Sequence, residues 1–277
     1  MAGISAASVK AFRERTGLPL MECKSALVEA GGDEDKAFAI LRERGEKLEE
    51  KRGSRETAFG RFGLYCGLDK ATGAIVELKC ESAPVTQNEQ FISLCNDLAE
   101  GLAKSTGKID TAEALQALPS PSRPGMTLGE QKAELFNRIR ENFEIGRMAK
   151  LEGTCGGYSH NLGTVAGVLV QIEGGSDEAA KDVSMHIAAM RPDALSKDDL
   201  DPAIVEQERE YLRSAVLKEG KPENIVDKMV EGRLQQFVAG KALLAQPFVK
   251  DDKQSVGDYA KSQGMTIKGF VLYILGQ

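Results

Sequence analysis

Tryptophan is absent from this sequence of 277 residues, and histidine occurs only twice, as His160 and His186. The chain therefore has few side chains that could form a histidine metal site or act in histidine-based acid–base catalysis. Aromatic residues make up 5% of the chain against 42% hydrophobic residues, so the core must be mostly aliphatic. We find no apolar run of about 18 residues and no signal-peptide pattern at the N-terminus. These absences predict a cytoplasmic protein without a membrane span.

The cysteines give little material for a metal or disulfide site. Five of them form no CxxC pair, which argues against a zinc ribbon and against a disulfide framework: Cys23, Cys66, Cys80, Cys95 and Cys155. A thiol-dependent hydrolase would need a pair such as Cys80 with His160. However, Cys80 ends an apolar strand pattern, which favours a buried and inert thiol. His186 lies in the apolar helix pattern VSMHIAAM and is predicted to be a hydrogen-bonded core residue.

Positive charge is too scarce for a typical nucleic-acid binder. The net charge is −6, whereas such binders carry a basic footprint that neutralises phosphates. A phosphate loop is missing too, because Glu22 and Cys23 stand where GxxxxGK[ST] requires Gly and Lys. We therefore expect no cofactor, no metal and no direct contact with nucleic acid. The composition predicts a protein that binds another protein and is not an enzyme.

Residues 1–46 predict a small three-helix module, similar to a ubiquitin-associated domain. Val9 and Phe12 mark the first helix, and the third helix begins at Asp33 and stops at Gly45. The predicted apolar residues of the second and third helices are Leu20, Cys23, Ala26, Leu27, Ala30, Ala37, Phe38 and Leu41. A core of this size is marginal, so the loop 17–20 is expected to be exposed to a partner. Residues 47–56 are mostly charged, a pattern that fits a solvated helix or a linker, and we assign them as the linker at the domain boundary.

The remaining sequence predicts an α+β core made of antiparallel sheets and helices, in two halves at 57–140 and 141–277. In the first half, β-rich runs at 61–67 and 74–80 precede a helix at 89–104. In the second half, a strand is again predicted before a helix, and this helix is similar in length to that of the first half. That strand covers 167–173, its helix covers 177–190, and further strands are predicted at 142–152 and 266–275.

The two halves contain an internal repeat. Residues 73–78 align with 167–172, and residues 96–99 align with 181–184. Between these anchors the first copy is nine residues longer, and the surplus lies at 81–90. An added loop on a duplicated scaffold is a natural place for function.

A helical hairpin is predicted at about 202–244, with its turn at Gly220-Lys221-Pro222. Apolar residues recur at helical spacing along its second arm, at Val226, Met229, Val230, Leu234, Phe237 and Val238. Such a stripe is usually core. In a hairpin it is alternatively a seam between the subunits of a homodimer.

The segment Thr16–Leu27, TGLPLMECKSAL, is similar to the motif TGAGMMDCKKAL of a translation-factor family. Together with KDVSMHIAAM from Lys181 and QPFVKDD from Gln246, it makes the chain resemble bacterial elongation factor Ts over nearly its whole length. Members of this family are guanine-nucleotide exchange factors for elongation factor Tu. The resemblance therefore implies binding to that partner and release of GDP and Mg²⁺ from it.

The resemblance implies partner contacts for Arg13, Met21 and Lys24. Methionine is a soft and adaptable contact residue, and Lys24 can pair with an acidic patch. Core packing of Met21 and a purely solvated Lys24 are the open alternatives. His160, after Tyr158 in GYSHN, matches a family histidine that contacts elongation factor Tu. The alternative is that His160 is a loop residue without a functional role.

The loop 81–91 departs from the family pattern. The family has ETDFVARNEEF, and this sequence has ESAPVTQNEQF, so Ala83 and Pro84 replace Asp and Phe. The family Phe wedges beside the switch region of its partner. We expect Pro84 to act as a smaller and rigid wedge, the alternative being that other contacts carry more of the exchange. Partner contacts are expected along the loop, at Glu81, Ser82, Ala83, Pro84, Val85 and Asn88.

Two rival functions remain beside nucleotide exchange. In the first, the N-terminal module is a ubiquitin-associated-like adaptor and the remainder is scaffold without exchange activity. In the second, a cysteine drives hydrolysis, which the shortage of histidine disfavours. The adaptor hypothesis explains the three-helix module but not the duplicated core.

Overall fold

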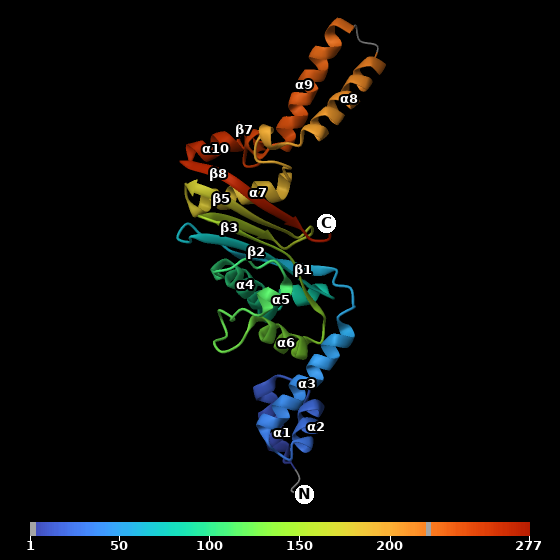
Figure 1. Cartoon of the computed structure of the whole chain (residues 1–277), viewed down its shortest axis with the longest axis vertical. Helices are drawn as coiled ribbons and strands as arrows, with labels where there is room; N and C mark the ends of the chain where they lie inside the picture. The colour runs from blue at the N-terminus through green and yellow to red at the C-terminus, as the bar shows by residue number, and fades with distance from the viewer. Residues whose placement is uncertain (1–3, 220–222) are drawn as a thin grey trace. The chain divides into compact units, whose positions relative to one another are not determined.

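The structure is a computed structural model that describes residues 4–219 and 223–277 (Figure 1). Helices and antiparallel sheets are both present, which confirms the α+β class. The chain forms two compact units. Unit 1 consists of Met1–Gly63, Val76–Met148 and Leu275–Gln277, and unit 2 consists of Leu64–Ile75 and Ala149–Ile274.

Unit 1 begins with three helices: α1 (Ala6–Thr16), α2 (Leu20–Glu29) and α3 (Glu34–Arg52). The Ser5 hydroxyl caps α1 by accepting a hydrogen bond from the Ser8 amide, and Gly17 ends α1 at φ 69°. The three helices share one apolar cluster, formed by Val9, Phe12, Leu18, Cys23, Ala26, Leu27, Ala37 and Leu41. We call α1–α3 the N-terminal module.

The prediction that the third helix stops at Gly45 is wrong, because α3 continues to Arg52. Glycine inside a helix costs only about 1 kcal/mol relative to alanine. At Gly45 it has a packing reason, since a Cβ there would lie 2.0 Å from Asn137 Oδ1. The first residues of the predicted linker are therefore helical.

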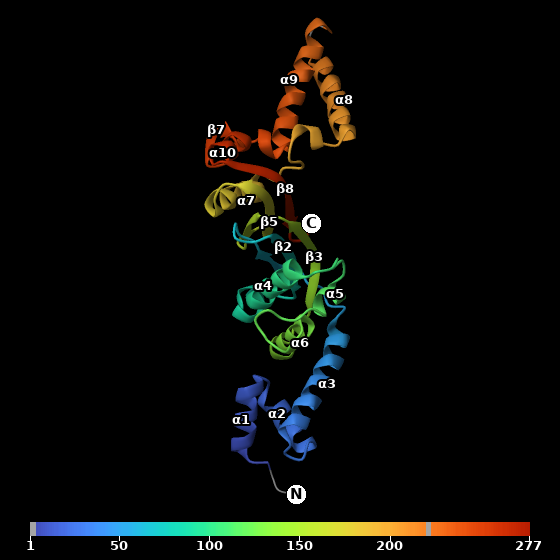
Figure 2. The same cartoon turned by 60° about the vertical axis from the view of Figure 1, so that its left-hand side comes forward.

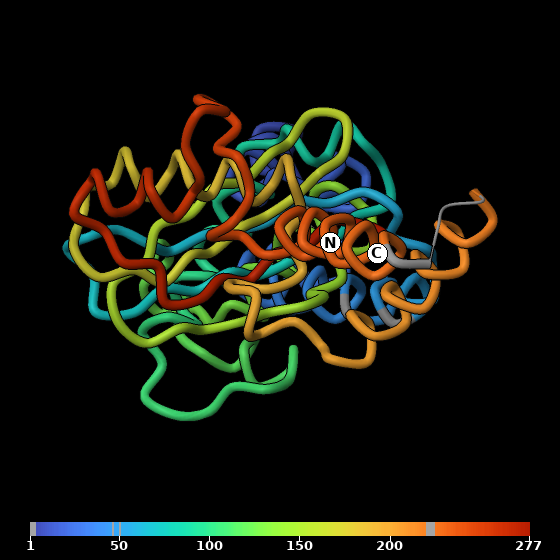
Figure 3. The backbone as a smooth tube through the Cα atoms, turned by 90° about the horizontal axis from the view of Figure 1, so that it is seen from above, coloured from blue at the N-terminus to red at the C-terminus, as the bar shows by residue number. Residues whose placement is uncertain are grey.

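The remainder of unit 1 carries α4 (Glu89–Lys104), α5 (Ala112–Gln116), α6 (Leu128–Ile139) and a 3-10 turn, η1 (Ala83–Gln87). The segment between α4 and α6 forms the loop drawn green in Figure 3. Helix α4 packs closely on the sheet, because a Cβ at Gly63 would lie 1.9 Å from the Cys95 carbonyl oxygen. Large apolar side chains fill this core, among them Phe62, Leu78, Phe91, Leu94, Leu98, Leu115, Leu128 and Phe136.

Strands β1 (Phe59–Tyr65), β2 (Thr72–Cys80) and β3 (Phe143–Glu152) form one sheet in the order β1-β2-β3. The predicted strand at 142–152 is confirmed, but it was assigned to the second half of the core. Its place beside β2 puts residues 143–148 in unit 1 instead. A strand's own pattern does not name its neighbour, which explains the misassignment.

Unit 2 contains an antiparallel sheet in the order β4-β5-β8, formed by β4 (Cys155–His160), β5 (Ala166–Gly174) and β8 (Met265–Ile274). Helix α7 (Asp177–Met190) packs on β4, since a Cβ at Gly156 would lie 2.4 Å from the Ala180 Cβ. The strands predicted at 167–173 and 266–275 and the helix at 177–190 are confirmed. Short elements complete this unit: η2 (Lys197–Asp199), η3 (Leu243–Ala245), β6 (Pro247–Phe248), β7 (Asp251–Ser255) and α10 (Val256–Ser262).

Helices α8 (Pro202–Lys218) and α9 (Glu223–Lys241) lie side by side (Figures 1 and 2). Val216 of α8 forms a buried cluster with Val226 and Val230 of α9. These two members of the predicted stripe therefore pack inside the chain. The predicted turn at residues 220–222 lies outside the described residues. Within the described ranges, every helix is too short or too polar to cross a membrane.

Candidate functional site

Helix α2 carries an exposed surface that we call the α2 face, formed by Leu20, Met21, Lys24 and Val28. The exposed fractions of Leu20, Met21 and Val28 are 49%, 69% and 60%, and Lys24 is exposed beside them. Leu20, Lys24 and Val28 follow one another at four-residue spacing and so share one side of the helix. The opposite side is buried in the module, which leaves a largely apolar face with one cation available for contact.

The exposure of side chains in the N-terminal module decides three expectations about it. Met21 does not pack in the core, so that alternative is excluded. The assignment of Leu20 and Phe38 to buried faces is wrong, because Leu20 is half-exposed and Phe38 is 51% exposed. Leu18, from the loop predicted to be exposed, is buried in the module instead. Arg13 is exposed on α1, and its carbonyl accepts the Gly17 amide at 2.7 Å.

The first part of the surplus segment, residues 81–88, is here called the 81–88 loop, and the first half of its turn presents Ala83 and Pro84 to solvent. Ala83 and Pro84 are exposed at the start of η1, whereas Val85 is buried beneath them. The turn is held from within, because the Thr86 hydroxyl donates to the Ala83 carbonyl at 2.7 Å. Arg61 also donates to the Thr86 carbonyl at 3.0 Å. The exposed tip is therefore a fixed turn.

Both ends of the 81–88 loop are anchored by side chains. The Glu81 carboxylate accepts the Asn142 amide at 2.6 Å. Glu141 accepts two hydrogen bonds from Ser82, from its amide at 3.0 Å and its hydroxyl at 2.6 Å. At the other end, the Asn88 side chain caps α4 by accepting the amides of Gln90 and Phe91. Of the loop residues predicted as contacts, Glu81, Ser82, Val85 and Asn88 hold the loop, and Ala83 and Pro84 face outward.

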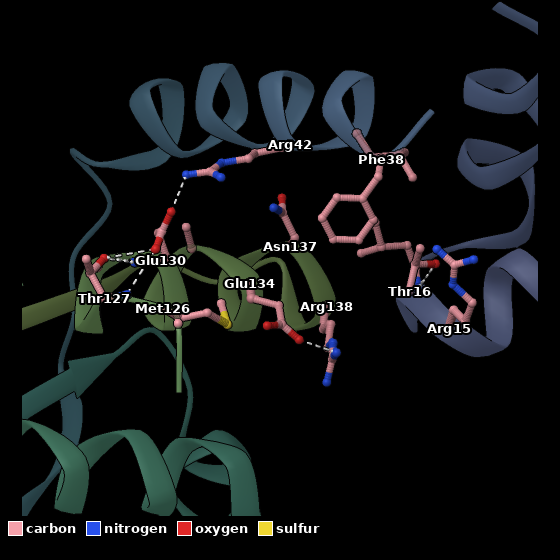
Figure 4. A pocket seen from close by; sticks show the side chains of 15 residues that line it. Arg15, Thr16, Phe38, Arg42, Met126, Thr127, Glu130, Glu134, Asn137 and Arg138 are labelled. Atoms are coloured by element: carbon pink, nitrogen blue, oxygen red, sulfur yellow. Dashed lines mark hydrogen bonds and ion pairs between the residues drawn. The ribbon is translucent and has the colours of Figure 1, made fainter. Parts of the chain in front are cut away.

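A cavity of about 610 Å³ lies between α3 and α6 within unit 1 (Figure 4). Phe38 and Arg42 reach into it from α3, while Asn137 and Arg138 line it from α6. Asn137 Oδ1 and Arg138 Nε are buried without a hydrogen-bond partner. Apolar packing between α3 and α6 is therefore interrupted here. Ion pairs join the helices at the rim, including Arg42–Glu130 at 2.8 Å.

Neither the Cys80 thiol nor the His186 imidazole is poised for catalysis. Burial raises the pKa of the Cys80 thiol to about 12, with a further contribution from the Glu141 carboxylate, so a reactive thiolate does not form at neutral pH. His186 is fully buried, as predicted, and hydrogen-bonded to Gln246 at 2.9 Å. Among residues 4–219 and 223–277, no group of three or more potential ligands is arranged to hold a metal ion.

His160 ends strand β4 in unit 2, half-buried, with its Nδ1 atom 3.0 Å from the Tyr158 hydroxyl. The turn that follows it exposes Leu162 to 77% and passes through Gly163 at φ 65°. Sequence reasoning missed Leu162 as a candidate contact. The available signal was a leucine inside the polar segment HNLGT between two strands.

The family model and the similar proteins that match this chain carry the same family description. The family model described as "Elongation factor TS" matches residues 84–277. An elongation factor Ts from Azoarcus sp. (strain BH72) is 40% identical over 279 residues, covering 100% of this chain and 92% of the relative. The protein of that name from Herminiimonas arsenicoxydans is 42% identical, with coverage of 100% and 92%. The one from Hydrogenobaculum sp. (strain Y04AAS1) is 37% identical, with coverage of 99% and 99%.

Proposed function

Because this chain belongs to the elongation factor Ts family, the nucleotide exchange factors of elongation factor Tu, we propose that its α2 face and its 81–88 loop act together on that partner. The α2 face supplies docking affinity, and the loop promotes the release of GDP. The exposure of Ala83 and Pro84 on a loop anchored at both ends is the observation that carries this proposal. An anchored turn can press on a partner without losing its shape.

Docking at the α2 face rests on Leu20, Met21 and Val28. Exposed apolar side chains in one patch favour burial against a partner, and methionine adapts to the opposing surface. Lys24 lies within the patch and fits an acidic group on elongation factor Tu. Arg13 is exposed in the preceding helix and is proposed as a further contact. In this role the N-terminal module acts as a ubiquitin-associated-like docking unit.

The 81–88 loop is proposed to act as a wedge. Pro84 lacks the area of an aromatic ring, which buries about 150–250 Å². Its ring nevertheless fixes φ, and the hydrogen bonds of Ser82 and Thr86 fix the turn around it. A rigid tip loses little conformational entropy when it inserts. Insertion beside the bound nucleotide would displace Mg²⁺ together with GDP.

Exchange follows from reciprocal linkage. A protein that binds nucleotide-free elongation factor Tu better than the GDP form must weaken GDP binding by the same factor. Weakening by a thousandfold requires about 4 kcal/mol of coupling. Typical couplings are about 1–3 kcal/mol, so more than one surface must contribute. We assign a third contact to the β4–β5 turn, through His160 and Leu162.

Helices α8 and α9 have a separate proposed role. Ile204, Tyr211, Leu217 and Ile225 remain exposed on this pair, although its inner residues pack within the chain. We propose the pair as a hairpin insertion and as the contact of a homodimer. The chain is expected to act in the cytoplasm, where translation takes place.

The test is stopped-flow release of a fluorescent GDP analogue from the cognate elongation factor Tu, with and without this chain. Strong acceleration is expected. If this chain bound elongation factor Tu without accelerating release, or with equal affinity for the GDP and nucleotide-free forms, the exchange proposal would be wrong. The adaptor alternative would then account for the binding.

A further inference from the structure

Three consecutive residues that follow α6 contact helix α2, which carries the α2 face, and the 81–88 loop. Arg140, Glu141 and Asn142 reach the α2 helix, the 81–88 loop and the end of α3. We propose that residues 140–142, here called the bracket, position the α2 face and the loop relative to each other. This inference rests on the proposed exchange function and names residues that act through the two surfaces without touching the partner.

The bracket holds the loop through its second and third residues. The Glu141 carboxylate accepts the Ser82 amide and hydroxyl at 3.0 and 2.6 Å, so both carboxylate oxygens are engaged. The Asn142 amide donates to Glu81 at 2.6 Å. Hydrogen bonds to charged groups are among the stronger ones. The loop therefore begins at a position that the bracket sets.

The bracket holds the N-terminal module through its first residue. The Arg140 guanidinium pairs with the Glu22 carboxylate, and Glu22 directly follows Met21 on α2. The Arg140 carbonyl accepts a hydrogen bond from Arg52, the last residue of α3. One residue thus ties α2 and α3 to the end of α6.

Asn142 ties the chain beyond α3 to the same point. Its side-chain amide donates to the carbonyls of Gly53 and Arg55 at 3.3 and 3.1 Å. Arg55 in turn pairs with Glu81 at 3.2 Å. The connection between the module and the loop is therefore closed by side chains as well as by the backbone.

The conformation of Arg140 is consistent with this role. Its φ is 65°, in the left-handed region where a glycine usually ends a helix. A side chain with a Cβ is disfavoured there, and such residues are retained where the surroundings require them. Here the side chain that glycine would lack makes the contact with Glu22.

The cavity between α3 and α6 explains why polar contacts matter for the module's position. Two buried polar atoms in its wall, on Asn137 and Arg138, have no hydrogen-bond partner. Continuous apolar packing, which would fix the two helices against each other, is therefore missing at this point. The ion pairs Glu22–Arg140, Arg42–Glu130 and Glu49–Lys132 around the interface carry that task.

Arg140→Gly is the informative variant, because it removes the Glu22 contact and relieves the positive φ together. Its thermal stability should stay close to that of the wild type. The maximal rate of fluorescent GDP release should fall about tenfold, since small misplacements of acting groups are costly. The concentration of chain that gives half-maximal release should change less, because the α2 face itself is intact.

A charge swap tests the pairing directly. Glu22→Arg and Arg140→Glu should each slow release, and the double variant should restore most of the rate. Arg44→Gln is the control, because it removes an ion pair of α3 with Glu29 inside the module. A structural role alone would not predict rescue by the swap.

The outcomes separate this inference from the function on which it rests. A wild-type chain that does not accelerate release contradicts the exchange function. Wild-type acceleration with an unchanged maximal rate in Arg140→Gly overturns the bracket alone. Single variants that are slow and are not rescued by the swap overturn it as well.

Discussion

Glu141 and Ser82 lie 59 residues apart in the chain and form a two-point contact, in which the carboxylate accepts both the amide and the hydroxyl of the serine. Ser82 directly precedes the exposed Ala83 and Pro84, so the contact fixes the chain where the loop leaves β2. An exchange loop must keep its shape while it presses on a partner. The contact supplies that restraint at the base of the turn.

Ser82→Ala should therefore lower both stability and exchange. The substitution removes one hydrogen bond to a partly buried carboxylate, and we expect about 1–2 kcal/mol less free energy of unfolding. The maximal rate of GDP release should fall as the loop loosens. Urea unfolding and stopped-flow release measure the two effects.

Thr57→Ala is the matched control for this prediction. Its hydroxyl also donates to a carboxylate, that of Glu144, at 2.6 Å. The control should lose some stability and retain the release rate. If both variants slowed release equally, general destabilisation and not the loop would be responsible.

Pro84→Gly tests the wedge. The substitution keeps the length of the loop but removes the ring and the fixed φ, which increases the freedom of the exposed tip. We expect the maximal rate of GDP release to fall severalfold and binding to nucleotide-free elongation factor Tu to weaken. Pro121→Gly, at an exposed proline between α5 and α6, is the control and should release GDP at the wild-type rate. An unchanged rate in Pro84→Gly would show that other contacts perform the exchange.

Met21→Ala tests docking through the α2 face. Because Met21 is exposed, its removal should leave the free energy of unfolding unchanged. The free energy of binding to elongation factor Tu should weaken by about 1–2 kcal/mol, as it does when a residue buried in an interface is truncated. Isothermal titration calorimetry measures the affinity. An unchanged affinity would place the docking surface elsewhere.

Lys24→Ala addresses the charge of the same face. The association rate and its dependence on salt should both decrease if Lys24 meets an acidic patch. Lys10→Ala is the control, because Lys10 is an exposed lysine on α1 paired only weakly with Glu14, at 3.9 Å. Equal effects of the two variants would indicate a general attraction between the proteins.

Local pattern was sufficient for much of the fold. Helices α4 and α7 begin and end where the sequence predicted, at 89–104 and 177–190, and the structure shows that Asn88 and Ser176 mark their starts by side-chain hydrogen bonds to the first turn. The sequence failed at Gly45, where the decisive partner, Asn137, comes from another helix. It failed again at β3, whose neighbour depends on the assembled sheet.

The candidate site also has one part that the sequence predicted and one part that only the structure shows. The resemblance identified the 81–88 loop and Met21, and spacing alone would have added Val28, four residues beyond Lys24. The anchor at the start of the loop was invisible to the sequence, because Glu81 meets the Asn142 amide 61 residues away. Sequence patterns describe which residues share a face, whereas contacts between distant segments depend on the completed fold.

His186 gives a prediction about pH that is independent of the partner. Its Nδ1 accepts the Val249 amide at 3.1 Å, so Nε2 carries the proton and donates to Gln246 at 2.9 Å. Burial lowers the pKa of His186 below its ordinary value of 6.5, opposed by the hydrogen bond to Gln246. The stability that this neutral ring contributes is present above pH 6.5 and is lost as the pH falls through the lowered folded pKa.

The thermal unfolding midpoint should therefore decrease between pH 7 and pH 5.5. His186→Leu should be less stable at pH 7, because it leaves the side-chain oxygen of the buried Gln246 without its partner, at about 1–3 kcal/mol. Its midpoint should depend less on pH. His160→Asn is the control, since His160 is the only other histidine and is partly exposed, and it should keep the wild-type pH dependence. Equal slopes for His186→Leu and the wild type would assign the acid sensitivity to carboxylates.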